Sequence, residues 1–479
     1  MLTLGTVVAA LTGSRPESAL LAHPIADVVI DSRRAGKHAL FVALAGENTD
    51  GHQFVREAFS SGAVVALVQQ DVGADCTVVD LRQSLPADQW LQRAQFPLCL
   101  RVEDSLAALQ RVAQHWRKQL DIRVVGVTGS VGKTTTKELT AAVLARRFCT
   151  LKNEGNLNNE IGLPLSLLQL TGRHERAVLE MGLYTPGEIA VLCEIAQPHV
   201  GVITNVYPVH LERAGSLENI AAGKGELVEA LPADPGGVAV LNADEPEVMA
   251  MAARTRARVF TYGLDPQADL WASHIEGMGL SGIRFRAHHQ GDTLHIRVPL
   301  LGRHSVHTAL RAAAVGLTEG LTWQEILEGL QAQDGQAQLR LYAVPGPQDS
   351  IILDDSYNAS PESAIAALNL LEDLDAARRV AVLGGMLELG SFEQQGHRAV
   401  GTRARDVADL LITIGALAEI IAEGARAAGM EESEIVRCRD GEEALAILKQ
   451  EIDAGDVVLV KGSRGMRLDR LVNELEARA

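Results

Sequence analysis

The sequence predicts an α/β protein with three domains, and three of its properties lead to that prediction. The chain has 479 residues, which is too long for a fold around one hydrophobic core of ordinary size. Aliphatic residues and glycine are abundant, whereas only 4% of the residues are aromatic, a composition typical of α/β proteins. Short aliphatic runs alternate with helical patterns, which indicates parallel sheets. We place the three domains at residues 1–120, 121–335 and 336–479.

Eight aliphatic runs, each next to glycine or a polar residue, are the strands on which this prediction rests. Ligands bind beyond the carboxyl ends of the strands in parallel sheets, so the residues that follow each run are candidates for a functional site. The polar stretch Asp334-Gly335-Gln336 is the expected linker between the second and third domains. The predicted strands are Val124–Val127, Ala177–Leu179, Val200–Ile203, Val238–Leu241, Ile351–Leu353, Val380–Leu383, Leu410–Ile414 and Val457–Val460.

Composition and charge also argue against several classes of protein. The formal net charge of −17 disfavours nucleic acid and anionic membranes as partners. The five cysteines are scattered and form no Cys-x-x-Cys pair, which disfavours a disulfide framework and a zinc site. The N-terminus lacks the basic residues of a signal peptide, and no apolar run reaches the ~18 residues of a membrane span. We therefore expect a cytoplasmic protein.

A glycine-containing loop in the second domain is the clearest functional signal. The predicted strand Val124–Val127 leads into a turn at Thr128–Gly132 and then into a predicted helix at Lys133–Arg147. This order places backbone N–H groups and the positive end of a helix against phosphate. We expect Lys133 to reach the β- and γ-phosphates of a nucleotide and the Thr134 hydroxyl to bind Mg²⁺. The residues expected to contact ATP here are Thr128, Gly129, Ser130, Val131, Gly132, Lys133, Thr134 and Thr135.

Two residues that follow predicted strands, Glu180 and His210, are candidate functional residues, and each also has an ordinary structural explanation. Glu180 directly follows a predicted strand, so its carboxylate would lie beside the loop and could hold Mg²⁺. An exposed glutamate at the end of a strand is the alternative. His210 follows another predicted strand and the trailing Asn205. A histidine satisfied by surface or core contacts is the alternative for that position.

Lys224 is a third candidate because it lies on the apolar face of a predicted helix. It is four residues after Ile220 and three before Leu227, so all three share one face. One explanation is that the lysine stem runs along the face and the ammonium reaches solvent. The other is carbamylation, because burial lowers the pKa of an amine and only the neutral amine adds carbon dioxide. The resulting anion would support Mg²⁺.

Motifs along almost the whole chain resemble the Mur ligase family. The segments Asp31–Arg33, Leu40–Leu44 and Asp50–His52 resemble its uridine-nucleotide-binding part, and Thr128–Thr134 is similar to its form of the phosphate loop. Glu180, His210 and Lys224 match the magnesium residues and the carbamylated lysine of the family. The other matching segments are Lys137-Glu138, Asn156–Pro164, Asp354–Pro361 and Lys461–Arg467.

The resemblance implies a mixed α/β N-terminal domain, a central P-loop ATPase domain with a parallel sheet, and a Rossmann-like C-terminal domain. It also implies an ATP-dependent reaction of peptidoglycan precursor synthesis, catalysed by a monomer. UDP-N-acetylmuramoyl-tripeptide would first form an acyl phosphate and ADP, and D-alanyl-D-alanine would then displace phosphate. The implied cofactors are two Mg²⁺ ions and the carbamate of Lys224.

The resemblance carries over to individual residues of this chain. It implies catalytic roles for Lys133, Glu180, His210 and Lys224, of which the last three, with Thr134, would hold metal. Further ATP contacts would come from Thr308, Arg340 and Asp355. The UDP-substrate would bind Ser32, Arg33, Ala43, Asp50, His52, Asn158 and Asn159. The dipeptide would bind Tyr357, Asn358, Lys461, Ser463 and Arg464.

Two alternatives stay open beside this interpretation. One is another amide ligase of the same family, which adds a single amino acid to a muramoyl peptide or glutamate to a folate. The segments Asn156–Pro164 and Lys461–Arg467 argue against it. The other is a nucleotide-binding regulator without catalysis. It is supported by departures from the family's pattern at Ser305 and Thr308, beside His304, and at Gly385. Ser360 is a further departure.

Overall fold

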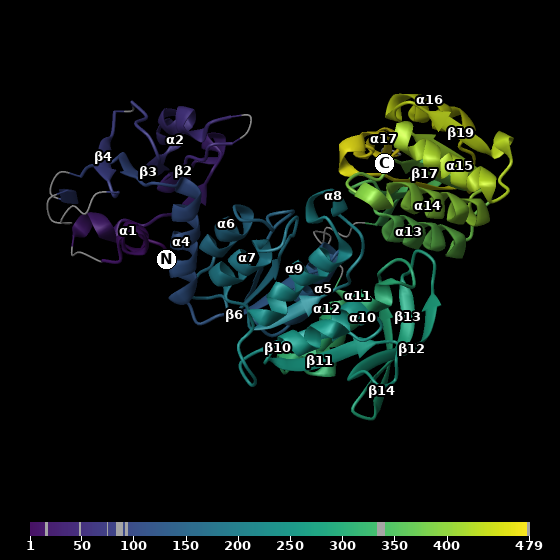
Figure 1. The fold of residues 1–479 in the computed structure, drawn as a ribbon, viewed down its shortest axis with the longest axis horizontal. Helices are drawn as coiled ribbons and strands as arrows, with labels where there is room; N and C mark the ends of the chain where they lie inside the picture. The colour runs from purple at the N-terminus through teal and green to yellow at the C-terminus, as the bar shows by residue number, and fades with distance from the viewer. Residues whose placement is uncertain are drawn as a thin grey trace. The chain divides into compact units, whose positions relative to one another are not determined.

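The computed structural model describes residues 1–14, 18–46, 49–73, 75–82, 90–91, 94–332 and 341–476 (Figure 1). Their strands form three sheets of five, nine and six strands, which confirms the α/β class. The chain forms two compact units. The first comprises 1–126, 148–182 and 187–199, and the second comprises 127–147, 183–186 and 200–479.

The first sheet is entirely parallel and has the strand order β1-β2-β3-β5-β4. Its middle strands are almost fully buried, as expected for a parallel sheet covered on both faces. The strands are β1 Asp27–Val29, β2 Ala39–Val42, β3 Ala63–Val68, β4 Thr77–Asp80 and β5 Leu98–Arg101. The helices in this part are α1 Leu4–Thr12, α2 Val55–Ser61 and α4 Ser105–Lys118.

The second sheet has the strand order β14-β13-β12-β11-β10-β9-β6-β8-β7. The pairs from β9 to β12 are parallel, and so is the pair β7–β8. Its strands are β6 Arg123–Thr128, β7 Thr150–Lys152, β8 Arg176–Glu180, β9 Val200–Ile203, β10 Val238–Asn242, β11 Arg258–Gly263, β12 Leu270–Gly277, β13 Ile283–His289 and β14 Asp292–Val298.

The second sheet differs from the prediction in one respect, because β12, β13 and β14 pair in antiparallel fashion. These strands alternate buried and exposed residues, so a search for continuous aliphatic runs passes over them. The helix after the phosphate loop is also shorter than predicted. It ends at Leu144 rather than Arg147, and the side chain of Arg147 instead pairs with Glu325 at 2.6 Å.

The helices of this region include three that pack together in the second unit, namely α5, α11 and α12. The N-cap residue of α12, Thr322, forms a capping box with Glu325. The helices are α5 Lys133–Leu144, α6 Gly162–Leu168, α7 Glu188–Ala196, α8 Leu211–Ala214, α9 Leu217–Glu229, α10 Pro246–Met249, α11 Ser305–Thr318 and α12 Trp323–Gln331.

The third sheet has the order β15-β16-β20-β17-β18-β19 and is parallel except for the pair β15–β16. Alternate residues of its strands enter two separate cores, so helices cover both faces (Figure 1). The strands are β15 Tyr342–Pro345, β16 Ile351–Asp355, β17 Arg379–Gly384, β18 Leu410–Ile414, β19 Ile435–Cys438 and β20 Val457–Lys461. The helices are α13 Pro361–Asp373, α14 Glu393–Val407, α15 Glu419–Ala427, α16 Gly441–Glu451 and α17 Asp469–Leu475.

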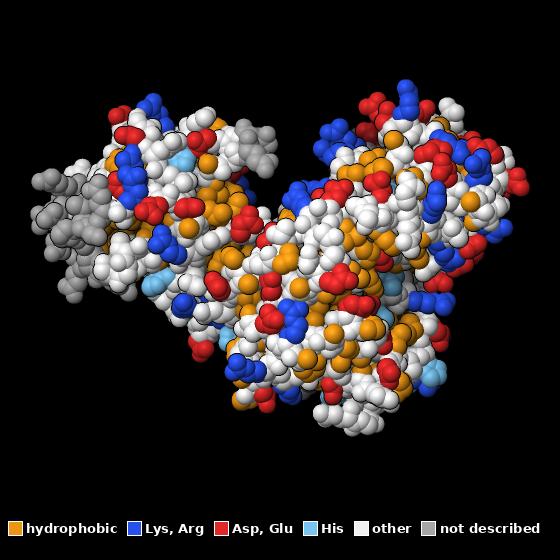
Figure 2. Space-filling view, viewed as in Figure 1, with side chains coloured by type: hydrophobic (Ala, Val, Ile, Leu, Met, Phe, Trp, Pro, Cys, Tyr) orange, Lys and Arg blue, Asp and Glu red, His pale blue; other side chains and the backbone are white. Residues whose placement is uncertain are grey.

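All eight strands predicted from aliphatic runs are present, most of them one or two residues longer than predicted. The expected linker Asp334–Gln336 and the expected ATP contact Arg340 lie outside the described residues. Acidic and basic side chains are interspersed on the face drawn in Figure 2. Among the described helices, none has both the length and the apolar character needed to cross a membrane.

Candidate active site

The phosphate loop follows β6 and leads directly into α5. Its first glycine, Gly129, has a φ of 145°, and a Cβ there would lie 1.8 Å from Oγ1 of Thr204. Only glycine fits this position, because the backbone of the loop closely approaches the segment that follows β9. Gly132 adopts the left-handed conformation and caps α5, so the first-turn N–H groups of Lys133, Thr134 and Thr135 lack helical acceptors. Such a helix start attracts anions.

The segment after β9 holds the loop through several hydrogen bonds. Thr204 Oγ1 donates to the Val131 carbonyl at 2.8 Å, and Val131 N–H donates to Asn205 Oδ1 at 2.8 Å. Ser130 Oγ donates to the Tyr207 carbonyl at 3.0 Å and accepts from Tyr207 N–H at 2.8 Å. The predictions from the sequence did not include this support. The signal that could have found it is the place of these residues, directly after a predicted strand.

Lys133 turns back over its own loop in this structure. Its Nζ donates to the carbonyl of Gly129 at 2.8 Å and to that of Ser130 at 3.1 Å. The ammonium is thus held at the start of α5, where the helix end is also positive. Thr134 is buried and Thr135 is partly exposed. The loop therefore gathers a fixed cation, a hydroxyl and backbone donors, the groups that phosphoryl transfer requires.

Lys224 is buried, with 2% of its surface exposed, in the middle of α9. The alternative in which its ammonium reaches solvent is therefore wrong. Gly225 allows this helix to pack closely, because a Cβ there would lie 2.0 Å from Nη1 of Arg254. Burial lowers the pKa of Lys224 well below its usual value, and the nearby charge of Lys133 lowers this pKa further. A buried amine of this kind favours the neutral form.

His210 begins α8 in the left-handed conformation, with φ of 58°. Its Nδ1 donates to the Glu388 carboxylate, and its ring meets the edge of the Tyr184 ring at 5.1 Å between centroids. Burial lowers the pKa of His210, and the charges of Lys133 and Lys224 act in the same direction, against Glu388. The structure thus brings Lys133, His210 and Lys224 near one another. Glu388 was missed because it is distant in sequence.

Glu180 ends β8 and is buried, so the alternative of an exposed strand-end glutamate is wrong. Its Oε1 accepts from Asn158 Nδ2 at 2.9 Å, and its backbone N–H donates to Asn153 Oδ1 at 2.9 Å. Asn159, the other expected substrate contact here, accepts from Gly162 N–H at 2.9 Å and so stabilises the start of α6. Asn158 therefore positions the Glu180 carboxylate in this structure.

The residues expected to bind the UDP-substrate have separate environments in the first sheet region. Ser32 is buried and donates to Glu57 at 3.0 Å, whereas Arg33 is exposed and pairs with Asp31. Ala43 is fully buried at the end of β2. His52 accepts from Gln69 N–H through Nε2 at 2.9 Å and donates through Nδ1 to Asp50 at 2.6 Å. Asp50 and His52 thus form a fixed pair.

The expected dipeptide contacts lie at the carboxyl ends of β16 and β20. Lys461 is buried and donates to the Asp355 carboxylate at 2.5 Å and to the Asn358 carbonyl at 2.9 Å. The guanidinium of Arg464 lies 5.7 Å from the centre of the exposed Tyr357 ring. Ser463 Oγ accepts from Leu387 N–H at 2.9 Å. The five dipeptide residues and the ATP candidate Asp355 are therefore neighbours.

The departures from the family's pattern have local explanations. Thr308 Oγ1 accepts from Arg311, and Ser305 Oγ donates to the Leu301 carbonyl at 2.7 Å. A Cβ at Gly385 would lie 2.9 Å from Cβ of Leu417, closer than real Cβ atoms come. Ser360 forms a capping box at the start of α13. His304, at the start of α11, is exposed.

Mg²⁺ was expected at Thr134, Glu180, His210 and Lys224. Among the described residues, no group of three or more His, Cys, Asp or Glu side chains could hold a metal ion. Mg²⁺ in phosphoryl-transfer enzymes is bound by one or two carboxylates together with substrate phosphates and water. The buried Glu180 carboxylate and the Thr134 hydroxyl are oxygen ligands of that kind. The residues therefore fit Mg²⁺ that is held largely through a nucleotide.

Family models match three stretches of the chain. They describe the Mur ligase family, catalytic domain, at residues 24–117, the Mur ligase middle domain at 127–316, and the Mur ligase, glutamate ligase domain at 340–464. A relative from Bacillus subtilis is 35% identical over 94% of this chain and 92% of its own length. The chain belongs to the Mur ligase family.

Two curated relatives of this Mur ligase share one name. The proteins from B. subtilis and from Escherichia coli, which is 33% identical over 94% of this chain and 93% of its own, are both called UDP-N-acetylmuramoyl-tripeptide–D-alanyl-D-alanine ligase. A MurF crystal structure from Acinetobacter baumannii matches with TM-score 0.82 and 28% identity over 98% of both chains. MurF from Thermotoga maritima, in complex with ADP, matches with TM-score 0.76 and 28% identity over 93% of this chain and 96% of its own.

Proposed function

We propose that this Mur ligase joins D-alanyl-D-alanine to UDP-N-acetylmuramoyl-tripeptide and forms ADP and phosphate. The observation that carries this proposal is the 35% identity to the B. subtilis ligase of that name, because it extends over 451 residues and so includes all three sheets. The ADP-bound relative supports the use of ATP. We place the reaction in the cytoplasm, where ATP and the UDP-linked precursor are both present.

The reaction needs ATP because a carboxylate is a poor electrophile. The terminal carboxylate of the tripeptide attacks the γ-phosphate of ATP, which forms an acyl phosphate and releases ADP. The amine of D-Ala-D-Ala then attacks the acyl carbon, loses a proton and expels phosphate from a tetrahedral intermediate. Both steps depend on positioning and on neutralisation of negative charge more than on an activated side-chain nucleophile.

The phosphate loop supplies the protein's part of that neutralisation. When nucleotide binds, Lys133 exchanges its contacts with the Gly129 and Ser130 carbonyls for the β- and γ-phosphate oxygens. The N–H groups at the start of α5 bind the same phosphates, as do the loop residues Thr128 to Thr135. The N–H groups are in place before substrate arrives, so among these donors only the Lys133 ammonium has to change its partners.

The roles of the remaining candidates complete this proposal. Thr134 and Glu180 hold one Mg²⁺, while His210, with carbamylated Lys224 in support, holds a second. Mg²⁺, when bound, neutralises phosphate oxygens during transfer. The burial of Lys224 supports its carbamylation, because the neutral amine is the form that adds carbon dioxide. The proposed contacts of the UDP-substrate and the dipeptide are those predicted from the sequence, and so are Thr308, Arg340 and Asp355 for ATP.

The release of phosphate from ATP tests the proposal against both alternatives. We expect release only when UDP-MurNAc-tripeptide and D-Ala-D-Ala are both present. A sibling amide ligase would instead release phosphate with a single amino acid as the acceptor. A nucleotide-binding regulator would release none with any acceptor, and either result would contradict the proposal.

A further inference from the structure

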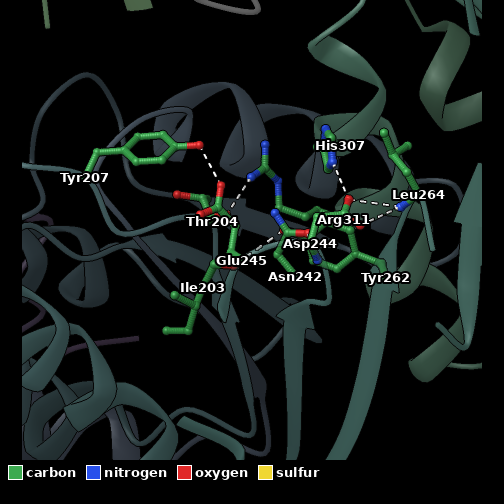
Figure 3. A network of polar contacts seen from close by, with 10 residues as sticks. All are labelled: Ile203, Thr204, Tyr207, Asn242, Asp244, Glu245, Tyr262, Leu264, His307 and Arg311. Carbon is green, nitrogen blue, oxygen red and sulfur yellow. Dashed lines mark hydrogen bonds and ion pairs between the residues drawn. The ribbon is translucent and has the colours of Figure 1, made fainter. Parts of the chain in front are cut away.

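Arg311, in the middle of α11, is a buried arginine with few partners. Only 4% of its surface is exposed. Its Nη2 donates to Thr308 Oγ1 at 2.8 Å, and its Nη1 lies 3.4 Å from the Thr204 carbonyl. Nε is buried and has no hydrogen-bond partner among the described residues. The guanidinium therefore leaves much of its donor capacity unused. Figure 3 shows its contact with Thr204.

A second arginine of this chain shows what a structural role looks like. Arg117, in α4, is equally buried at 4% exposure. Its Nε, Nη1 and Nη2 donate to the carbonyls of Ala196, Leu120 and Ile122 at 2.9, 3.1 and 2.8 Å. Every guanidinium nitrogen of Arg117 is thus satisfied by backbone. Arg311 is equally buried, but its guanidinium nitrogens are not all hydrogen-bonded, so its burial needs another explanation.

The acidic residues near Arg311 do not supply its counter-charge. Glu245 accepts from the Tyr207 hydroxyl at 2.6 Å, and Asp244 accepts from His307 at 2.8 Å and from Leu264 N–H (Figure 3). In the part of the chain that the structure describes, Arg311 forms no ion pair with any carboxylate. A buried cation without a paired carboxylate is costly even with the Thr308, Thr204 and Tyr262 contacts, so a site of this kind is suited to an anionic ligand.

The position of Arg311 indicates which anion it binds. Its Nη2 lies 3.4 Å from where a Cβ of Gly132 would be, and Gly132 caps the phosphate-loop helix α5. The guanidinium thus lies beside a helix start whose N–H groups already favour phosphate. Arginine suits phosphate well because its donors are arranged as a fork.

We propose that Arg311 binds the phosphate chain of the nucleotide and so makes recognition depend on those phosphates. This inference rests on the proposed function, since it assumes that ATP occupies the loop. The phosphate supplies the counter-charge that the protein lacks at Arg311. Thr308 then orients the guanidinium through the bond at 2.8 Å rather than contacting the base. The motifs of the chain gave no indication of this residue.

The test compares ligands that differ in their phosphates. We would measure the Kd of ADP with magnesium, and of adenosine, by calorimetry for wild type, R311M and R311Q. A lost charge-assisted contact is expected to weaken ADP binding by about tenfold or more. Adenosine binding should stay within about twofold, because it lacks the phosphates. R311Q is the second variant and serves if R311M does not fold, because its amide keeps a polar group near the place of Nε while the guanidinium is lost.

R117Q is the matched control. It should lower thermal stability without changing the ratio of the Kd values of ADP and adenosine. The inference is overturned if the Arg311 variants bind ADP as wild type does, or if they lose ADP and adenosine equally. Failure of both Arg311 variants to fold would assign the residue a structural role and overturn it as well. The ligation assay of the wild-type enzyme distinguishes this inference from the proposed function. If the wild-type enzyme binds ADP but forms no ligation product, only the proposed function is contradicted.

Discussion

At the scale of single residues, Lys224 gives the sharpest test of the chemistry. Lys224→Ala removes the proposed carbamate, so we expect ligation to fall by at least about a hundredfold. Short carboxylates such as acetate should restore part of it, because they can occupy the space and charge of the carbamate. The measurement is the ligation rate with and without added carboxylate, together with the intact mass of the active enzyme.

Lys449→Ala is the control for this experiment, because Lys449 is exposed on α16. It should keep the wild-type rate and show no response to acetate. Active wild-type enzyme should carry the mass of one added carbon dioxide. Full activity with an unmodified lysine would contradict the carbamate.

His397 makes stability depend on pH. It is fully buried, accepts from Met386 N–H through Nε2 at 2.9 Å, and donates through Nδ1 to the Glu393 carbonyl at 2.7 Å. Burial lowers the pKa of His397 below its usual value of 6.5, against the opposing effect of the Glu393 carbonyl. As the pH falls through about 6.5, the imidazole of His397 takes up a proton in the unfolded chain but not in the folded protein. The folded state therefore becomes less stable relative to the unfolded state.

We expect urea unfolding to show this loss between about pH 7 and about pH 5. His397→Gln should be less sensitive to pH over that range, because glutamine can accept from Met386 without titrating. The readout is the slope of the unfolding free energy against pH, whatever the absolute stability of the variant. Equal slopes for the wild-type protein and the His397→Gln variant would show that His397 does not contribute to the pH dependence of stability.

Sequence patterns predicted some of the site residues and not others. The place of Lys224 on an apolar helical face beside Ile220 and Leu227 made burial one of two explanations, and the structure shows that the residue is buried. Glu388 and Arg311 could not be found that way, because their partners are far away in the sequence. His210 lies 178 residues before Glu388, and Thr204 lies 107 residues before Arg311.

At the scale of elements, the segment after β9 determines the shape of the phosphate loop. Asn205 both accepts from Val131 N–H and donates to the Val131 carbonyl, at 2.8 and 3.1 Å. Asn205→Ala should free the loop, so that nucleotide binding must order it again. We expect the KM for ATP to rise about thirtyfold, as the loss of two hydrogen bonds of about 1 kcal/mol each implies. Steady-state kinetics at varied ATP measure it.

Asn369→Ala provides the comparison, because Asn369 is an exposed residue of α13 whose side chain accepts from Arg403 at 2.7 Å, far from the loop in sequence. It should leave the KM for ATP unchanged. An Asn205 variant with the wild-type KM would show that the loop keeps its shape without this support.

Whether the sequence predicted a strand depended on how the two faces of that strand are buried. Strands buried on both faces, such as Val200–Ile203 and Leu410–Ile414, are continuous aliphatic runs and were found with their bounds. The antiparallel strands β12 to β14 alternate buried and exposed residues and were missed. The end of α5 was misplaced because Arg146 and Arg147 are compatible with a helix, although the helix ends at Leu144.

At the scale of the whole molecule, the order of functional parts along the chain agrees with the family. The models of its three domains match in sequence order, and each stretch contains one of the three sheets or most of it. The first stretch contains five of the seven residues expected to bind the UDP-substrate, the second contains the phosphate loop with Asn158 and Asn159, and the third contains the expected dipeptide residues. This order is the reason to expect three substrates rather than ATP alone.

The most direct measurement is the mass of the product formed from ATP, UDP-MurNAc-tripeptide and D-Ala-D-Ala. The proposed function predicts UDP-MurNAc-pentapeptide, heavier than the tripeptide substrate by one D-Ala-D-Ala less one water, with one ADP and one phosphate for each product. Unchanged tripeptide substrate, or a product formed only with a single amino acid, would contradict it.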